Sequence, residues 1–359
     1  MKKRLFLLFV ILSMAALVAA CGSNASNSNQ APAQSSQTPS ETGEAGESGS
    51  APADSEKPKE LVKIKAAYPA LSGAMLQIWV MEDAKLDEKY GLDMELVYLQ
   101  GTPPALQALD SGEIDFTYAG GTGVLSANLS GQDVIYIANP QPKYVFYLYG
   151  QPGINSLEDL RGKTFAAGPV GAAFDNVPRY AFKQVGMDVD KDLKEYVHLG
   201  NASLILAALE KGTADGGVLS PPHSFSADKQ GFTKIADMTK EGPNTISVGM
   251  VTKKETLQES PEVAKNFMKA FVEAVQVIKE DPETAKKALA NYSGIKDEGE
   301  LEQTYEIYKE TFPNIPYVYD EQVLDIAAGL KDAPSPLDPK QFYDNSLLEQ
   351  LEKEGFVKP

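Results

Sequence analysis

The chain has 359 residues, with 33 Lys and Arg against 50 Asp and Glu and a formal net charge of −17 at pH 7. An acidic surface repels phosphate backbones, so the composition argues against nucleic acid as a partner. A single Cys and two His cannot supply a disulfide framework or a zinc site, and we expect neither a metal nor another cofactor.

Residues 1–21 are typical of an export signal. Met1–Arg4 is basic, Leu5–Leu17 is apolar, and small residues precede Cys21. The apolar run is too short and wrongly flanked for a membrane-spanning helix. The ending resembles the lipobox of bacterial lipoproteins, in which the cysteine is acylated and becomes the first residue. We therefore expect a lipid anchor on Cys21 that holds the protein at the outer face of the cell membrane. The alternative is a plain secretory signal with an incidental cysteine.

Residues 22–59 are rich in Ser, Asn, Gln, Pro, Gly and Glu and hold almost no large apolar side chain. Such a segment cannot bury enough apolar surface to offset the entropy that it would lose on ordering. We predict a disordered tether here, followed by a folded body of about 300 residues. That length suits one large or two medium domains.

The folded body repeats one pattern about a hundred residues apart. Each copy contains a strand, a small-residue loop, a helix, a second strand, a helix ending at Gly, and a third strand that follows an Asp. Two such α/β units predict two similar lobes with mainly parallel strands. Chance similarity is the alternative, because Leu-rich helix ends followed by Gly are common. The paired segments are strands 63–68 and 163–167, strands 93–99 and 196–199, helix ends 106–109 and 206–209, and strands 116–119 and 216–219.

The pattern beyond Pro261 is helical. Val263, Phe267 and Phe271 recur at spacings of three and four, and Ser260 before Pro261 is a favourable helix start. We expect the C-terminal helices to pack on the first lobe, after a strand at 246–252 has returned the chain to it. The predicted helices span 261–280, 282–291, 300–311, 320–330 and 345–354.

The loops that follow the predicted strands are rich in Gly, Ser, Thr, Pro and Asn. In open α/β sheets, ligands bind beyond the carboxyl ends of the strands. Most of these loops also precede a helix, whose first N–H groups lack partners and carry the positive end of a dipole. Several helix starts around one cleft would bind an anion with few charged side chains. Ordinary turn and capping chemistry is the alternative for any single residue. The loops are 68–73, 100–103, 118–123, 168–175, 200–201 and 220–224.

Several side chains near these loops have both a binding and a structural interpretation. Tyr68, Tyr118 and Phe174 could form a wall against a ring, or pack in the core. His223 follows two prolines at a strand end, where it contacts a ligand or supports the turn. Trp79 lies between Ile78 and Val80 on the first helix, and we expect it in the core.

Residues 89–97 read KYGLDMELV. This segment resembles the K-x-G-L-x-V-E-hydrophobic pattern of the ABC-transporter receptors for nitrate, sulfonate and taurine, and of their relatives that bind thiamine-pyrimidine precursors. Met94 stands where that pattern usually has Val. Residues 105–116, the Gly120-Gly121 strand end, 157–163 and 219–222 are also similar to this family, so the resemblance covers about residues 64–251.

The resemblance implies an α/β, two-lobed type II periplasmic-binding-protein fold, with two mixed sheets flanked by helices and a ligand cleft between the lobes. The first lobe is expected at 60–147 plus 247–359, and the second at 148–246. The arginine that some anion receptors place in the cleft has no clear counterpart unless it is Arg179, although a solvated helix face is the favoured position for that residue. The loops and the resemblance together predict a ligand site made of Tyr68, Ser72, Gly73, Thr102, Gly121, Thr122, Gly171, Ala172, Phe174, Asn201, Ser220 and His223.

The function implied by the resemblance is that of a lipid-anchored solute-binding protein of an ABC importer, without enzymatic activity. It would capture a small organic anion, such as a sulfonate or carboxylate, by lobe closure and deliver it to permease and ATPase subunits. One alternative is a receptor for a neutral heterocycle such as a thiamine-pyrimidine precursor, and another is a ligand-sensing lipoprotein. A related enzyme makes the thiamine pyrimidine, but it carries a cysteine-rich iron motif that this chain lacks. We expect a monomer.

Overall fold

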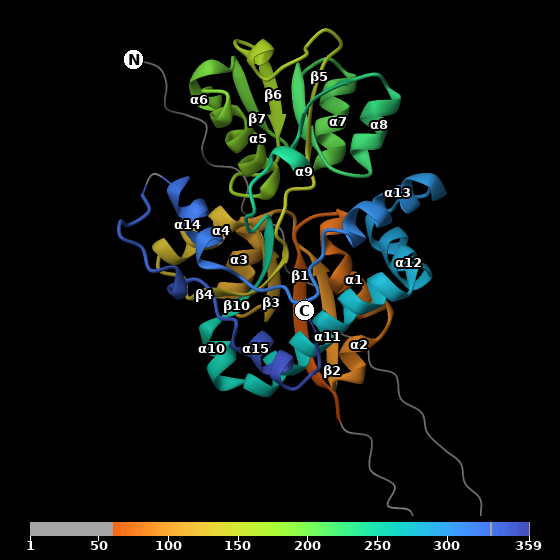
Figure 1. The fold of residues 1–359 in the computed structure, drawn as a ribbon, viewed down its shortest axis with the longest axis vertical. Coiled ribbons are helices and arrows are strands. Elements are labelled where there is room, and N and C mark those ends of the chain that lie inside the picture. The colour runs from red at the N-terminus through yellow and green to blue at the C-terminus, as the bar shows by residue number, and fades with distance from the viewer. Residues whose placement is uncertain (1–59, 331, 359) are drawn as a thin grey trace, which may run out of the picture. The chain divides into compact units, whose positions relative to one another are not determined.

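The computed structural model describes residues 60–330 and 332–358, so the predicted signal, Cys21 and the tether at 22–59 lie outside the described residues. The described chain forms two five-stranded sheets, each flanked by helices (Figure 1). Both sheets are mixed, because each contains one antiparallel strand. The predicted fold class is confirmed.

The first sheet has the strand order β2-β1-β3-β10-β4. Strands β1, β2 and β3 run parallel to one another, and β10 lies antiparallel between β3 and β4. The predicted return strand at 246–252 is therefore β10, which begins two residues later. The strands are β1 (Val62–Tyr68), β2 (Leu92–Tyr98), β3 (Phe116–Ala119), β4 (Val134–Gln141) and β10 (Val248–Lys253).

The second sheet has the order β7-β6-β8-β5-β9 and repeats the first position by position. Strands β6, β7 and β8 are parallel, and β5 lies antiparallel between β8 and β9. The place of β10 in the first sheet is thus taken by β5 in the second. These strands are β5 (Tyr147–Gly150), β6 (Thr164–Ala167), β7 (Glu195–His198), β8 (Gly216–Leu219) and β9 (Thr233–Asp237).

In each of the two α/β units, one aspartate before the third strand is hydrogen-bonded to the first strand. The carboxylate of Asp115 accepts a hydrogen bond from the Lys65 amide at 2.8 Å, and the Asp115 amide donates to the Lys65 carbonyl at 2.8 Å. Asp215 makes the same two contacts with Thr164, at 2.9 and 2.8 Å. Each Asp therefore sets the register of the third strand of its unit against the first. This shared contact and the shared strand order support the predicted duplication.

The chain passes between the sheets twice. It leaves the first sheet after Gln141, joins the second at Tyr147, and returns between Asp237 and Val248. We call the first sheet with its helices the first lobe, and the second sheet with its helices the second lobe. The residue limits predicted for the lobes stay a prediction.

The helices of the first lobe include most of the C-terminal segment, as expected. Helix α11 buries Phe267 and Phe271 against the lobe and packs along α1 and α12. Helix α13 begins two residues before the predicted start, because the Asp297 side chain caps it by accepting from the Glu300 amide. The helices are η1 (Gly73–Met75), α1 (Leu76–Asp83), α2 (Leu86–Lys89), α3 (Thr102–Asp110), α4 (Gly121–Leu129), α10 (Lys254–Glu259), α11 (Pro261–Glu280), α12 (Pro282–Ser293), α13 (Glu298–Lys309), α14 (Asp320–Ala328), η3 (Pro339–Gln341) and α15 (Ser346–Lys353).

The helices of the second lobe are shorter on average. Helix α5 buries Val177, Ala181 and Phe182, and Phe182 meets Phe165 of β6 edge-to-face at 5.2 Å. Over the described residues, no helix is both long and apolar enough to cross a bilayer. The helices are η2 (Glu158–Leu160), α5 (Ala173–Gln184), α6 (Val189–Asp192), α7 (Ala202–Glu210), α8 (His223–Lys229) and α9 (Met238–Glu241).

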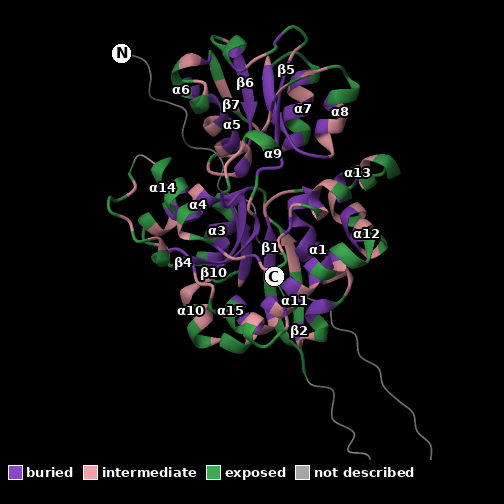
Figure 2. Ribbon diagram, viewed as in Figure 1, coloured by how far each residue is buried: buried purple, intermediate pink, exposed green. Residues whose placement is uncertain are grey.

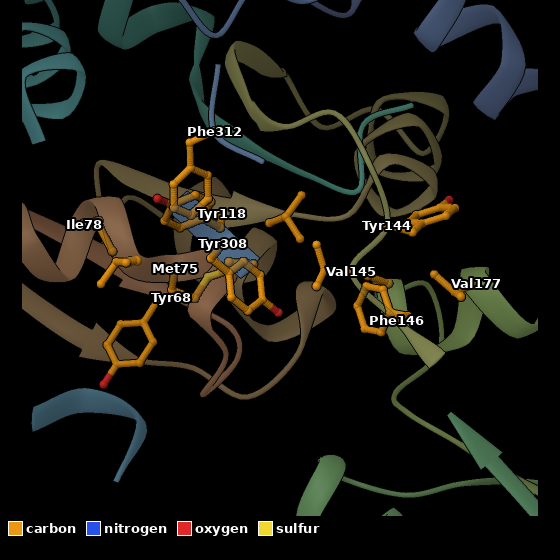
Figure 3. Packing of buried hydrophobic residues seen from close by; sticks show 14 of the residues in the cluster. Tyr68, Met75, Ile78, Tyr118, Tyr144, Val145, Phe146, Val177, Tyr308 and Phe312 are labelled. Carbon is orange, nitrogen blue, oxygen red and sulfur yellow. The ribbon is translucent and has the colours of Figure 1, made fainter. Parts of the chain in front are cut away.

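Most buried apolar side chains belong to one large cluster that continues from the first lobe into the second, and a smaller second cluster lies within the first lobe. The central strands of both sheets are buried (Figure 2). Figure 3 shows the connection, in which Val145 lies between Met75 and Tyr118 of the first lobe and Phe146 and Val177 toward the second. The crossing segment is therefore part of the core.

Candidate functional site

A cavity of about 130 Å³ lies where the carboxyl ends of the two sets of parallel strands meet. This is many times the space that one water needs. Its wall on the first lobe consists of Pro69, Ala70, Leu71, Ser72, Ala74, Met75, Tyr98, Gly101, Thr102, Gly120, Val248 and Ser293. Its wall on the second lobe consists of Phe146, Pro169, Ala172, Ala173, Phe174, Gly200, Asn201, Ala202, Ser203 and His223.

Helix starts from both lobes surround the cavity. The η1–α1 segment, α3 and α4 contribute residues at or just before their first turn, and so do α5, α7 and α8. The first N–H groups of a helix have no partner within it, and they carry the positive end of its dipole. The duplicated strand–loop–helix unit therefore brings backbone donors to the cavity from two sides.

The backbones of the two lobes come close together beside Gly120. A Cβ atom on this residue would lie 3.1 Å from the Gly171 carbonyl oxygen and 3.5 Å from the Ala173 nitrogen. The Thr122 hydroxyl donates to the same Gly171 carbonyl at 3.3 Å. A side chain at position 120 would be in tight contact with the backbone of the other lobe, so the Gly-rich loop after β3 serves the contact between the lobes.

Two polar side chains organise helix starts at the cavity wall. The Thr102 hydroxyl accepts from the Gly120 amide at 3.1 Å and so joins the start of α3 to the start of α4. Asn201 caps α7, because its side chain accepts from the Leu204 amide at 3.0 Å. Both side chains thus fix the positions of helix starts that line the cavity.

A tyrosine of helix α13 meets the loops of both lobes. The Tyr308 hydroxyl lies 2.9 Å from Oγ of Ser72, and the Ser220 hydroxyl is a second hydrogen-bond partner of Tyr308. The Tyr308 ring occupies the space where a Cβ on Gly73 would lie, 2.2 Å from Cδ2. Figure 3 shows Tyr308 within the buried cluster, with Phe312 nearby. Burial raises the pKa of Tyr308, so this phenol is neutral and can donate.

The imidazole of His223 is the basic group on the cavity wall. Its Nε2 lies 2.8 Å from Oγ of Ser203, which is in the first turn of the neighbouring helix α7. Burial lowers the pKa of His223, although the carboxylate of Glu300 opposes the shift. The ring is therefore neutral near pH 7, where it can donate or accept one hydrogen bond.

Aromatic rings form the apolar part of the wall. Phe146 and Phe174 meet edge-to-face with ring centroids 4.8 Å apart. Tyr98 lies on the opposite wall, 5.4 Å from the ring of Tyr68 behind it. Such a wall favours a ligand with an apolar or ring-shaped part.

Charged side chains are lacking on the described cavity wall, which contains no Asp, Glu, Lys or Arg. Arg179 donates to Asp175 at 2.8 Å and to Asp190 at 3.0 Å, and its guanidinium stacks on the ring of Tyr196. Its charge is therefore balanced by two carboxylates. No group of three or more His, Cys, Asp or Glu side chains in the described part of the chain is placed to hold a metal ion.

The structure brings half of the predicted site residues to the cavity and puts the others behind it. Tyr68 is 8% exposed and packs on Trp79, and Tyr118 is fully buried with its hydroxyl on Gln77. The expected core position of Trp79 is confirmed. Ser72, Thr102, Ala172, Phe174, Asn201 and His223 line the cavity, whereas Tyr68, Gly73, Gly121, Thr122, Gly171 and Ser220 do not.

Other lining residues were not predicted. Tyr98 is the last residue of β2, and Phe146 lies in the crossing segment. The position of Tyr98 at a strand end was a usable signal. Phe146, Ser203 and Ser293 have no distinctive sequence context, because their positions depend on how the lobes and helix α12 pack.

Curated relatives match most of the chain. A protein of Brucella abortus named as a candidate binding protein is 25% identical over 274 residues, which cover 74% of this chain and 84% of the relative. A protein of Brachyspira hyodysenteriae named as a candidate ABC transporter periplasmic binding protein is 23% identical over 283 residues, which cover 74% of this chain and 78% of the relative.

Solved structures share the fold at low sequence identity. The alkanesulfonate-binding protein SsuA from Xanthomonas axonopodis pv. citri, bound to MOPS, has a TM-score of 0.63 at 19% identity, covering 75% of this chain and 91% of that one. The periplasmic nitrate-binding protein NrtA from Synechocystis PCC 6803 has a TM-score of 0.66 at 12% identity, covering 82% and 89%. The two-lobed fold of periplasmic binding proteins is thereby confirmed.

The sequence model of the family described as NMT1/THI5 like matches residues 88–285, which is more than half of the chain. This match begins one residue before the 89–97 segment that carries the resemblance to the receptors, and it continues through both lobes into α12. The resemblance is confirmed, and the chain belongs to the NMT1/THI5-like family.

Proposed function

We propose that the protein is an extracytoplasmic solute-binding protein of an ABC importer. The observation that carries this proposal is the cavity between the lobes, which is lined by helix starts from both of them. Closure of the lobes traps the solute, and the extent of closure depends on how much better the closed form binds it. The names of the relatives support the transport setting.

Delivery to an importer is the second part of the proposal. The protein hands the solute to the permease of an importer whose ATPase drives transport, and lipid on Cys21 keeps it at the outer face of the cell membrane. The tether at 22–59 lets the folded body reach the permease. We infer that it acts as a monomer, because both walls of the cavity come from one chain.

The ligand of this site is a small organic anion, such as a sulfonate or carboxylate, held by backbone donors. Each helix start contributes roughly 0.3–1 kcal/mol, and up to about 2 kcal/mol when partly buried. Several of them with the hydroxyls of Ser72 and Thr102 supply much of the roughly 8 kcal/mol that a micromolar affinity needs. The alkanesulfonate-binding and nitrate-binding relatives in the fold agree with an anion.

A neutral heterocycle is the second candidate ligand, favoured by a specific observation. The described wall holds no Lys or Arg, and it presents Tyr98, Phe146 and Phe174 to the cavity. Rings bind such surfaces through apolar burial and edge-to-face contacts. In this version His223 and Ser203 pair with a ring nitrogen or amine.

Mass spectrometry of small molecules released from the purified protein, followed by thermal-shift measurements, tests these proposals. A panel of alkanesulfonates, aromatic carboxylates and aminopyrimidines separates the two ligand classes. Stabilisation by anions alone supports the first class, and stabilisation by uncharged rings alone rejects it. Release of a chemically altered panel compound contradicts the receptor role altogether.

A further inference from the structure

Helix α13 contacts the second lobe near both of its ends, although it belongs to the first. Near its start, Oε1 of Glu300 lies 2.8 Å from Nζ of Lys229 on α8. Near its end, the Tyr308 hydroxyl reaches Ser220, which follows β8. Figure 1 shows α13 on the side of its lobe that faces α8. One helix therefore bridges the lobes beside the cavity.

The two charges of the ion pair are placed where each helix favours them. Glu300 lies in the first turn of α13, and Lys229 lies in the last turn of α8. These positions complement the dipoles of the two helices, so each charge is also tolerated when the pair is broken. The Glu300 side chain is only 19% exposed, whereas that of Lys229 is 63% exposed. Lys229 is thus the more exposed partner of the pair, and Glu300 is the more buried one.

We propose that Glu300 and Lys229 form a latch that sets solute affinity from outside the cavity. This inference rests on the proposed function, because it requires lobes that close around a solute. Closure brings Lys229 to Glu300 and holds α13 against the second lobe. The Tyr308 hydroxyl is then kept between Ser72 and Ser220 at the edge of the cavity. Opening separates both contacts together, since their partners belong to different lobes.

The latch stabilises the closed form of the protein and not the open form. An interaction present only after closure slows the release of a solute more than it speeds capture. Partly exposed ion pairs contribute modestly, so loss of this pair corresponds to a weakening of about two- to fivefold in affinity. Glu300 and Lys229 act as positioning residues, because neither lines the cavity.

The test measures lobe separation directly. Nitroxide labels are attached at Lys63→Cys on β1 and Lys194→Cys before β7, two exposed positions on different lobes. The full chain carries Cys21→Ser, which leaves the labels as the only thiol sites. Label-to-label distances are then measured by pulsed electron–electron double resonance in four backgrounds: the otherwise unchanged chain, Lys229→Glu, Glu300→Lys, and both changes together.

Each single substitution is expected to shift the distance distribution toward longer separations, and the exchanged pair is expected to restore it. Glu298→Lys is the matched control, because it makes the same charge change two residues earlier, at an exposed position in the first turn of α13. Failure of the double variant to restore the short distance overturns the latch, and so does an equal shift in the control.

A second measurement separates the latch from the receptor role. The rate at which a stabilising panel compound dissociates is expected to rise in both single variants and to recover in the exchanged pair. Equal dissociation rates in all variants overturn the latch and leave the receptor role intact. A restored short distance in a protein that binds none of the panel compounds supports the latch and counts against the proposed ligand classes.

Discussion

The hydroxyl of Tyr308 lies 2.9 Å from Oγ of Ser72, although 236 residues separate them in the chain. Ser72 follows the first strand of the first lobe, and Tyr308 is carried by a helix that follows the return from the second lobe. The contact therefore makes one edge of the cavity depend on a C-terminal helix outside the duplicated units.

Tyr308→Phe is expected to weaken solute binding while the fold is retained. The change removes one phenol and leaves the hydroxyls of Ser72 and Ser220 with one partner fewer, at a cost of about 0.5–1.5 kcal/mol in unfolding free energy. Urea unfolding and thermal-shift titration measure the two effects. Tyr305→Phe is the control on the same helix, because its hydroxyl donates to the Ile278 carbonyl at 2.8 Å, away from the cavity. Equal losses of binding in both variants contradict a role for Tyr308 at the cavity.

Gly120→Ala is expected to hold the lobes apart. The added methyl would lie 3.1 Å from the Gly171 carbonyl oxygen, which is tighter than ordinary contact. Small-angle scattering should therefore give a larger radius of gyration, with little change in the thermal midpoint. Ser126→Ala, which also leaves an alanine but at an exposed site of α4, should change neither quantity. An unchanged radius in Gly120→Ala rejects this contact as the limit to closure.

Glu82→Gln is expected to stabilise the protein at alkaline pH and not at acid pH. Burial, with a smaller contribution from Asp87, raises the pKa of Glu82 to about 6, and its Oε2 has no hydrogen-bond partner. In the unfolded chain the Glu82 carboxyl ionises near pH 4.3. Between pH 4.3 and about 6 the folded state therefore binds more protons than the unfolded chain, and it loses stability as the pH rises. The gain should be about 1 kcal/mol at pH 8, allowing for solvent screening, and should vanish near pH 4.5. Urea unfolding at both values measures it, with the exposed Glu113→Gln as control.

His223 is expected to make the protein less stable as the pH falls below about 6.5. Burial lowers the pKa of His223, so in this window the unfolded chain binds more protons than the folded one. The unfolding free energy therefore falls as the pH falls. His223→Gln removes this component, and the thermal midpoint should then fall less steeply between pH 7 and pH 5. An identical slope in the variant contradicts a buried, neutral imidazole.

The regular elements were predictable where the signal is local. The strands at 116–119 and 216–219 coincide with β3 and β8, and the helix at 261–280 coincides with α11. Each is fixed by its own apolar pattern and by a Pro, Gly or Asp at its boundary. The helix predicted at 282–291 ends two residues too early, and the helix predicted at 300–311 is shifted by two residues, because capping and the last turn are decided by individual side chains.

The site was predictable only as far as topology determines it. Residues after parallel strands, such as Ser72 and Asn201, must lie near the carboxyl ends of the sheets, so their place at the cavity follows from strand order. Tyr68 lies on the last position of β1, and its side chain turns toward Trp79 rather than the cavity. Phe146 and Tyr308 come from the crossing segment and from α13, and only the packing of the lobes brings them to the site.

The place of β10 has a consequence for the order in which the chain can be assembled. All five strands of the second sheet lie between Tyr147 and Asp237 in one uninterrupted segment, whereas the first sheet needs Val248–Lys253 between β3 and β4. During synthesis from the N-terminus, the later sheet can therefore be finished while the earlier one still has a gap in its middle. Until Lys253 has emerged, the facing edges of β3 and β4 remain open to mispairing, and a holdase chaperone would find its substrate there.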